Sequence, residues 1–182
     1  MDKKLQGEIK MNFIELSKAR YSVRDFSDRP VEEEKLRLIL EAGRLAPTAV
    51  NSQPQRIFVL KSKESIEKIR KATRMAYNAP VVLMICYDRN SSWKAARFGE
   101  SHDTGEEDAS IVTTAMMMQA TELGIGTLWA RGYNTKDITD AFGIPDNLQL
   151  VCLLDLGYPS ETSKPSDMHF SRVPLEETVT EL

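Results

Sequence analysis

Residues 107–123, EDASIVTTAMMMQATEL, form the longest helical pattern in the chain and decide the fold class. Apolar residues recur three and four positions apart along two faces of this helix. One face carries Ala109, Val112, Met116, Ala120 and Leu123, and the other carries Ile111, Ala115 and Met118. A helix that is apolar on two sides must be covered on two sides. We therefore predict that a sheet covers one face, and our hypothesis for the other is a second subunit.

Apolar runs elsewhere in the chain supply the sheet. Residues 80–87, PVVLMICY, are continuously apolar, which predicts a central strand covered on both faces. Further strands are predicted over residues 56–61, 127–130 and 149–156, and helices over residues 11–18, 32–46, 65–75 and 135–142, the last with Thr135 as its N-cap. This mixture of helices and strands indicates the α+β class.

Length and composition limit the possible classes of function. A chain of 182 residues with 41% hydrophobic and 28% charged residues is typical of a globular protein, and we expect a single domain over residues 1–182. A net charge of -3 gives no reason to expect nucleic acid or an anionic membrane as a partner. No apolar run is long enough to cross a bilayer, and residues 1–8 lack the apolar core of a signal peptide, so we predict a cytoplasmic protein without a membrane partner.

The cysteines and histidines do not indicate a metal site. Cys86 and Cys152 each lie inside an apolar run, which is typical of reduced, buried cysteines. His102 and His169 are far apart in the sequence, and neither belongs to a pattern of metal ligands.

The first candidate site is the segment RYSVRDF at residues 20–26. If it is extended, the alternation of side chains places Arg20, Ser22 and Arg24 on one face. A row of cation, hydroxyl and cation suits a phosphate and the anionic edge of a ring. A solvated basic turn explains the same residues, and for this segment alone it is the simpler explanation.

The second candidate site is the loop PTAVNSQP at residues 47–54, which offers short polar side chains between a helix and a strand. Ordinary turn chemistry also selects such residues. Residues 88–106 lack periodicity, so we interpret them as a lid over a pocket, with a partly helical surface crossover as the alternative. The proline-containing tail, residues 157–182, is predicted to be an irregular arm that covers the body or a partner.

Taken in order, these pieces resemble the FMN-dependent nitroreductase family from about Phe13 to Val179. The resemblance rests on Arg20-x-Ser22-x-Arg24, on residues 46–54 (APTAVNSQP), on residues 123–129 (LGIGTLW), on residues 156–159 (LGYP) and on residues 172–177 (RVPLEE). It implies a three-layer α-β-α sandwich with a central, mostly antiparallel sheet and a long central helix. It also implies a homodimer in which both subunits contribute to each flavin site.

Residue by residue, the resemblance implies an FMN site with a role for each part. Arg20 and Ser22 would bind the phosphate and ribityl end together with Arg172, and Arg24 would lie by the pyrimidine edge of the flavin. Arg131 and Gly132 would flank flavin N5. The residues that the resemblance places at the cofactor are Arg20, Tyr21, Ser22, Arg24, Pro47, Thr48, Ala49, Asn51, Gln53, Trp129, Arg131, Gly132 and Arg172. The chain departs from the family at Phe170, where a basic residue is common, and at Arg131, where some members are acidic.

The function implied is an FMN-dependent oxidoreductase that uses NADH or NADPH and reduces nitroaromatic, quinone or related small-molecule acceptors by ping-pong hydride transfer. No protein acid, base or nucleophile is required, because the flavin carries the chemistry. Two alternatives remain open from the sequence. One is a non-catalytic FMN-binding or redox-sensing protein. The other is a specialised relative of the dehalogenase or dehydrogenase type.

Overall fold

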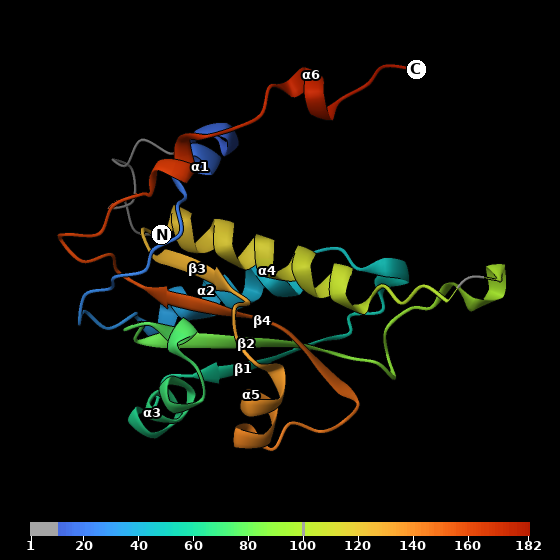
Figure 1. Cartoon of the computed structure of the whole chain (residues 1–182), viewed down its shortest axis with the longest axis horizontal. Helices are drawn as coiled ribbons and strands as arrows, with labels where there is room; N and C mark the ends of the chain where they lie inside the picture. The colour runs from blue at the N-terminus through green and yellow to red at the C-terminus, as the bar shows by residue number, and fades with distance from the viewer. Residues whose placement is uncertain (1–10, 100) are drawn as a thin grey trace, which may run out of the picture.

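The fold is a four-stranded sheet with helices on both faces, seen in a computed structural model that describes residues 11–99 and 101–182 (Figure 1). The prediction about a signal peptide concerns residues 1–8 and lies outside the described residues. The elements in chain order are α1 (Phe13–Ala19), α2 (Glu33–Leu45), η1 (Ala49–Asn51), β1 (Gln55–Leu60), α3 (Lys63–Ala72), η2 (Arg74–Ala76), β2 (Val81–Asp88), η3 (Ala95–Phe98), α4 (Gly105–Glu122), β3 (Gly126–Ala130), α5 (Thr135–Phe142), β4 (Leu148–Gly157), η4 (Asp167–Phe170) and α6 (Leu175–Thr178).

The sheet has the order β1-β2-β4-β3, and every neighbouring pair of strands is antiparallel. The central strand β2 pairs with β1 on one side and with β4 on the other, as its continuous apolar sequence predicts. The register between β2 and β4 shifts at Ile85 and Cys86, because Ile85 lies opposite Cys152 and Cys86 lies opposite Leu150. Val151 is therefore the extra residue of a β-bulge.

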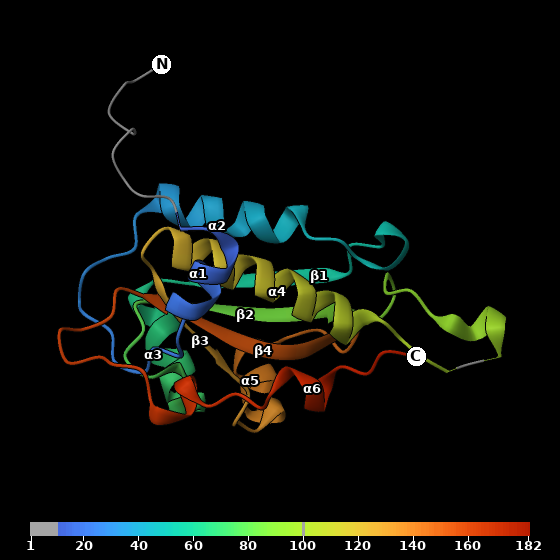
Figure 2. The ribbon, with the colours of Figure 1, turned by 90° about the horizontal axis from the view of Figure 1, so that it is seen from above.

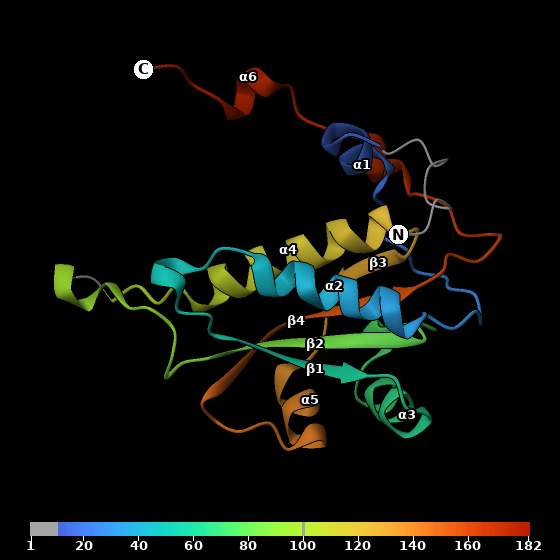
Figure 3. The ribbon, with the colours of Figure 1, turned by 180° about the vertical axis from the view of Figure 1, so that it is seen from behind.

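Each face of the sheet has its own apolar core. Val82, Met84 and Cys86 of β2 pack toward the side that holds α3 and α5, whereas the alternate residues of β2 pack toward α2 and α4. Figure 3 shows α2 and α4 above the sheet, with α3 and α5 below it. This arrangement confirms the predicted three-layer sandwich, and both cysteines are free and buried as predicted.

The two predicted faces of α4 differ in their surroundings. Ala109, Val112, Met116 and Ala120 are buried against α2 and the sheet. On the second face Ile111 is exposed, and Ala115 and Met118 are only partly buried. Within the described chain, then, one of the two apolar faces is covered.

Several predicted boundaries were wrong by a few residues, for local reasons. The helix α4 begins at Gly105 rather than at position 107, after the Asp103 carboxylate accepts a hydrogen bond from the Gly105 N–H at 2.9 Å. Asn134, not Thr135, is the N-cap of α5, since its side chain accepts a hydrogen bond from the Lys136 N–H. The predicted helix over residues 65–75 is α3 followed by the short turn η2.

Two segments project from the body, as Figures 1 and 2 show. Residues 89–99 and 101–104, here called the excursion, extend past the start of α4. They contain η3 and a bridge between Lys94 and Asp103, so the predicted irregular span has local structure. The C-terminal arm, residues 158–182, contains η4 and α6, and α6 lies away from the sheet. No helix in the described ranges is long and apolar enough to cross a membrane.

Gly105 lets α4 start directly beside Tyr87 of β2. A Cβ atom at position 105 would lie 2.0 Å from Cδ2 of the Tyr87 ring, which is far inside van der Waals contact. We expect Gly105→Ala to lower the free energy of unfolding by about 1–3 kcal/mol, because the ring must move out of a packed position. Urea denaturation measures the change.

The matched control for this variant is Gly132→Ala, since a Cβ atom there meets only Met75, at 3.5 Å or more. Its expected effect is within about 0.5 kcal/mol. Adding Tyr87→Leu should recover part of the stability lost in Gly105→Ala. Equal destabilisation by both glycine variants would contradict the proposed clash.

Candidate functional site

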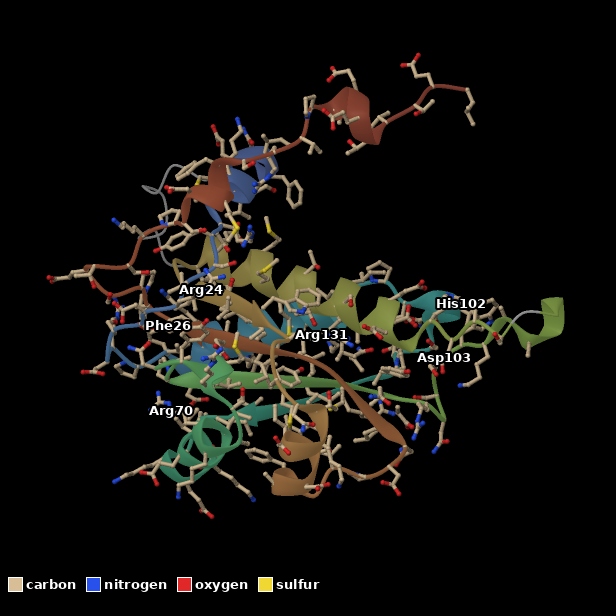
Figure 4. The ribbon with its side chains drawn as sticks, in the orientation of Figure 1. Arg24, Phe26, Arg70, His102, Asp103 and Arg131 are labelled. Atoms are coloured by element: carbon tan, nitrogen blue, oxygen red, sulfur yellow. The ribbon has the colours of Figure 1, made fainter. Side chains whose placement is uncertain are left out.

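A pocket of about 190 Å³ brings three predicted residues of the first segment together with the arm. Arg20, Ser22 and Arg24 line it on one side, and the arm contributes Ser166, Met168, His169 and Arg172. We call it the cation pocket. Figure 4 places Arg24 near the end of the molecule where α4 terminates.

The alternation of side chains in this segment follows from its attachment to the sheet. Ser22 forms a parallel bridge with Thr127 of β3, and the Val23 N–H donates to the Thr127 carbonyl at 2.9 Å. Val23 and Phe26 are buried beneath the segment. The backbone is thus extended, and Arg20, Ser22 and Arg24 share the other face, as predicted.

The cation pocket carries an excess of positive charge. Within the described ranges, none of Arg20, Arg24 and Arg172 forms an ion pair with a carboxylate. Burial lowers the pKa of Arg20, and the nearby Arg172 guanidinium lowers it further. Arg24 donates to the Ser22 carbonyl at 3.2 Å, and Arg172 donates to the His169 carbonyl at 2.7 Å. Arg172 also donates to the carbonyls of Ser171 and Met168, but these acceptors are neutral, so guanidinium groups without a carboxylate partner in the described ranges make a site for an anion.

Hydrogen bonds from the segment hold the arm in place beside it. The Asp25 carboxylate accepts hydrogen bonds from the Ser160 hydroxyl and, at 2.9 Å, from the Thr162 hydroxyl. These hydrogen bonds lower the pKa of the Asp25 carboxyl, and the one from Ser160 has the largest effect. The Tyr21 hydroxyl lies 3.2 Å from the Ser163 hydroxyl. Tyr21 therefore supports the arm, and it lies next to the cation pocket rather than in its lining.

The predicted loop at residues 47–54 has a strained backbone. Val50, Asn51 and Gln53 all have positive φ angles, of 47°, 59° and 48°. A β-branched residue in this region is a conformational outlier, and such strain is typical of functional sites. The side chain of Val50 is also 71% exposed, although it is apolar.

The buried carboxylate of Asp108, in the first turn of α4, holds this loop. It accepts hydrogen bonds from the Ala49 N–H at 2.8 Å, from the Thr104 hydroxyl at 3.0 Å and from the Ser52 hydroxyl at 3.4 Å. Within the loop, the Thr48 hydroxyl accepts a hydrogen bond from the Gln53 N–H at 3.0 Å. Pro47, Asn51 and Gln53 are exposed.

The loop and the cation pocket lie at opposite ends of α4 in one chain (Figure 3). The loop is bound to Asp108 near the start of the helix, whereas Arg20 shares a second pocket with Thr121 near its end. Between positions 108 and 121 the helix rises roughly 20 Å, at ~1.5 Å per residue. One subunit alone does not bring the two predicted halves of the site together.

Arg131 and Gly132 lie just after β3 and are not part of the lining of the cation pocket. The Arg131 guanidinium forms an ion pair with Glu106 at 2.8 Å and donates to the carbonyl of the bulge residue Val151 at 2.7 Å. Figure 4 shows Arg131 over the middle of the sheet. Trp129 is partly buried against the core beside α4. The three atoms nearest to a Cβ atom built at Gly132 all belong to Met75, at 3.5 to 3.9 Å, and both Arg131 and Gly132 are exposed.

The sequence patterns missed several residues that the structure places in or beside these features: Ser166, Met168 and His169 in the cation pocket, Asp108 under the loop, and Glu106 beside Arg131. His169 lies three positions before Arg172, and that short spacing was the available signal. In the ranges the structure describes, no three or more histidine, cysteine, aspartate or glutamate side chains are grouped so that they could hold a metal ion.

Comparison with known proteins identifies the class of protein to which this fold and pocket belong. The sequence model of the nitroreductase family matches residues 18–77 and 72–158. The chain belongs to the nitroreductase family.

Individual relatives agree with this family. The structure superposes with a TM-score of 0.86 on a nitroreductase family protein from Clostridium difficile 630, at 42% identity over 93% of this chain and 98% of the other. A protein of Methanothermobacter thermautotrophicus, provisionally named NADH dehydrogenase/NAD(P)H nitroreductase, is 32% identical over 90% of this chain and 86% of its own length. A provisionally named nitroreductase from Desulfovibrio desulfuricans, solved in complex with FMN, has a TM-score of 0.76 and 25% identity over 93% of this chain and 95% of its own.

Proposed function

We propose that this protein is an FMN-dependent NAD(P)H oxidoreductase that works as a homodimer, with each chain forming a single domain. The observation that carries the proposal is the cation pocket: three arginines without carboxylate partners in the described ranges surround a space of about 190 Å³. A phosphate monoester supplies the missing negative charge and accepts several charge-assisted hydrogen bonds. The FMN complex of the relative from Desulfovibrio desulfuricans supports the choice of anion.

The remaining cofactor contacts are those that the resemblance to the family implies. Arg20, Ser22 and Arg172 bind the phosphate and ribityl end, and Arg24 lies by the pyrimidine edge of the flavin. A cation at that edge favours the reduced flavin and so raises its potential. Because Gly132 has no side chain, its backbone N–H would be able to approach flavin N5. Arg131 and Trp129 would lie beside Gly132.

A second copy of the chain supplies the other half of the site. The loop residues Pro47, Thr48, Ala49, Asn51 and Gln53 reach the flavin of the partner, which explains why they lie so far from the cation pocket of their own chain. Apolar side chains exposed on α1, α4 and the arm support a dimer: Phe13, Ile14, Ile111, Phe170, Val173 and Leu175. Tyr21 contributes indirectly, by supporting the arm.

The reaction proposed is a two-electron transfer from a nicotinamide to an acceptor. When bound, FMN would supply the hydride-transfer chemistry between NADH or NADPH and a nitroaromatic, quinone or related acceptor, with the two substrates using the same place in turn. The protein binds and orients the reactants, and solvent supplies protons. The excursion leaves the body at the same end as the strained loop. Since the loop reaches the partner's flavin, the excursion would lie over the partner's site as well. There it would influence the choice of acceptor. Localisation in the cytoplasm stays a prediction.

The experiment that tests the function is anaerobic stopped-flow mixing of the FMN-loaded protein with NADH and with NADPH. We expect at least one of them to bleach the flavin absorption band, and an added quinone to restore it. A protein that binds FMN, is reduced by dithionite and is bleached by neither nicotinamide is a flavin carrier or sensor rather than this enzyme. A protein that holds no flavin at all contradicts the proposal entirely.

A further inference from the structure

His169 connects the cation pocket to α1. His169 lines the pocket together with Arg20 and Arg172, and its backbone carbonyl accepts a hydrogen bond from Arg172 at 2.7 Å. Its Nε2 atom lies 3.1 Å from the backbone carbonyl of Lys18, and its ring packs edge-on against Phe170, at 4.9 Å between ring centroids. These contacts fix the position of the imidazole at the edge of the pocket.

The hydrogen bond to Lys18 decides which ring nitrogen can titrate. A carbonyl oxygen only accepts hydrogen bonds, so Nε2 must carry a hydrogen in this geometry. The other nitrogen, Nδ1, is therefore the atom that gains or loses a proton. Neutral Nδ1 is an acceptor and offers nothing to a phosphate oxygen, whereas protonated Nδ1 is a charged donor.

Positively charged side chains surround His169 on the described linings of two pockets. Arg20, Arg24 and Arg172 line the cation pocket with it, and Lys18 and Arg172 line the neighbouring pocket on its other side. Tyr21 faces the ring edge-on, at 6.4 Å between centroids. The described linings of both pockets contain no carboxylate. A bound phosphate would add negative charge beside these cations, although Asp25 shares a further pocket with Arg24 and Asp167 lies in η4 with His169.

We propose that His169 is a proton-linked ligand of the FMN phosphate: binding of the cofactor draws one proton from solvent onto Nδ1, which then donates to a phosphate oxygen. The inference rests on the proposed FMN site. It also explains how the chain tolerates Phe170, whose side chain is 73% exposed and carries no charge. The neighbouring imidazole supplies the charge instead.

Isothermal titration calorimetry with FMN at pH 7.5, in two buffers with different enthalpies of ionisation, tests this inference. The negative charge of the phosphate favours the charged form of the imidazole, so we expect a net uptake of a fraction of a proton per FMN. The phosphate itself titrates near pH 6 and contributes little at this pH. Between pH 6.5 and 8.5 the affinity should fall by about five- to tenfold.

Two controls isolate His169. His169→Gln keeps an Nε2 donor for the Lys18 carbonyl but cannot take up a proton, so its binding of FMN should be proton-neutral and nearly independent of pH over this range. Riboflavin lacks the phosphate and should bind the wild-type protein without proton uptake.

The possible results separate this inference from the proposed function. If FMN binds with the same proton count in the wild-type protein and in His169→Gln, the proton-linked role of His169 is wrong while the flavin site stands. If FMN binds neither protein, the proposed function itself is wrong. Proton uptake with riboflavin equal to that with FMN would show that the proton belongs to another group.

Discussion

Replacing Asp155 with asparagine is expected to make the protein more stable at pH 8, by about 2–5 kcal/mol, and to remove most of the fall in stability between pH 5 and pH 8. Asp155 lies in β4 between Val82 of β2 and Leu128 of β3, and it is completely buried. Neither of its carboxylate oxygens has a hydrogen-bond partner in the described part of the chain. An isolated carboxylate in such a position is costly to ionise.

The direction of this pH dependence follows from the pKa of Asp155. Burial raises that pKa from 3.8 to about 8, and the partly opposing influence of Arg70 is smaller. The guanidinium of Arg70 donates instead to the Ala79 carbonyl, at 3.1 Å. Because its carboxyl pKa is raised, the folded state binds more protons than the unfolded state between about pH 4 and pH 8. The free energy of unfolding is therefore highest below about pH 4 and falls as the pH rises toward 8.

Urea denaturation at pH 5, 6, 7 and 8 measures this effect. The free energy of unfolding of the wild-type protein should fall by up to about 1.4 kcal/mol per pH unit in this range. That of Asp155→Asn should be nearly independent of pH. Asp137→Asn, on the exposed side of α5, is the matched control and should follow wild type. Parallel profiles for wild type and Asp155→Asn would mean that Asp155 is not the titrating group.

Replacing Arg20 with alanine is expected to weaken FMN binding by about 10- to 150-fold, which corresponds to about 1.5–3 kcal/mol for a charge-assisted hydrogen bond. Arg20 is the half-buried arginine of the cation pocket, and its interaction with Arg172 is repulsive until an anion binds between them. Quenching of flavin fluorescence on binding gives the dissociation constants.

Comparison with riboflavin identifies the phosphate as the group that Arg20 binds. Riboflavin keeps the ribityl chain but lacks the phosphate, so its affinity should fall much less than that of FMN in Arg20→Ala. Lys71→Ala removes an exposed cation from α3 and should leave both ligands unaffected. Unchanged FMN affinity in Arg20→Ala would rule out the assignment of the cation pocket.

The elements were largely predictable because each is encoded locally. The apolar face of α4 from Ala109 to Ala120 and the continuous run of β2 identify two layers without any knowledge of long-range contacts. Alternation in an extended segment placed Arg20, Ser22 and Arg24 together for the same reason. Boundaries were less predictable, since at Gly105 and Asn134 side-chain hydrogen bonds set where the helix starts.

The rest of the candidate site depends on contacts between distant parts of the chain. Val50 has a positive φ angle, although a β-branched residue prefers a negative one. Hydrogen bonds from the loop to Asp108, which is distant in the sequence, accompany this conformation. His169 enters the cation pocket because η4 packs against the end of α1. The pairing of Arg131 with Glu106 joins the end of β3 to the start of α4. None of these contacts has a periodic or composition signal.

The central claim is that one subunit supplies the cation pocket and the other supplies the loop of each flavin site. The most direct measurement mixes two variants, Arg20→Ala/Arg172→Ala, which disables the pocket, and Asn51→Ala/Gln53→Ala, which disables the loop. Neither homodimer should bind FMN with wild-type affinity. In a mixed dimer one site combines the intact pocket of one subunit with the intact loop of the other.

Co-expression of the two variants, followed by flavin titration, should therefore recover tight binding at about one quarter of all sites, since random pairing makes half of the dimers mixed. Each variant expressed alone should recover none. If the co-expressed, demonstrably mixed dimers bind no more FMN than the separate variants, then both halves act within one chain, and the shared site is wrong.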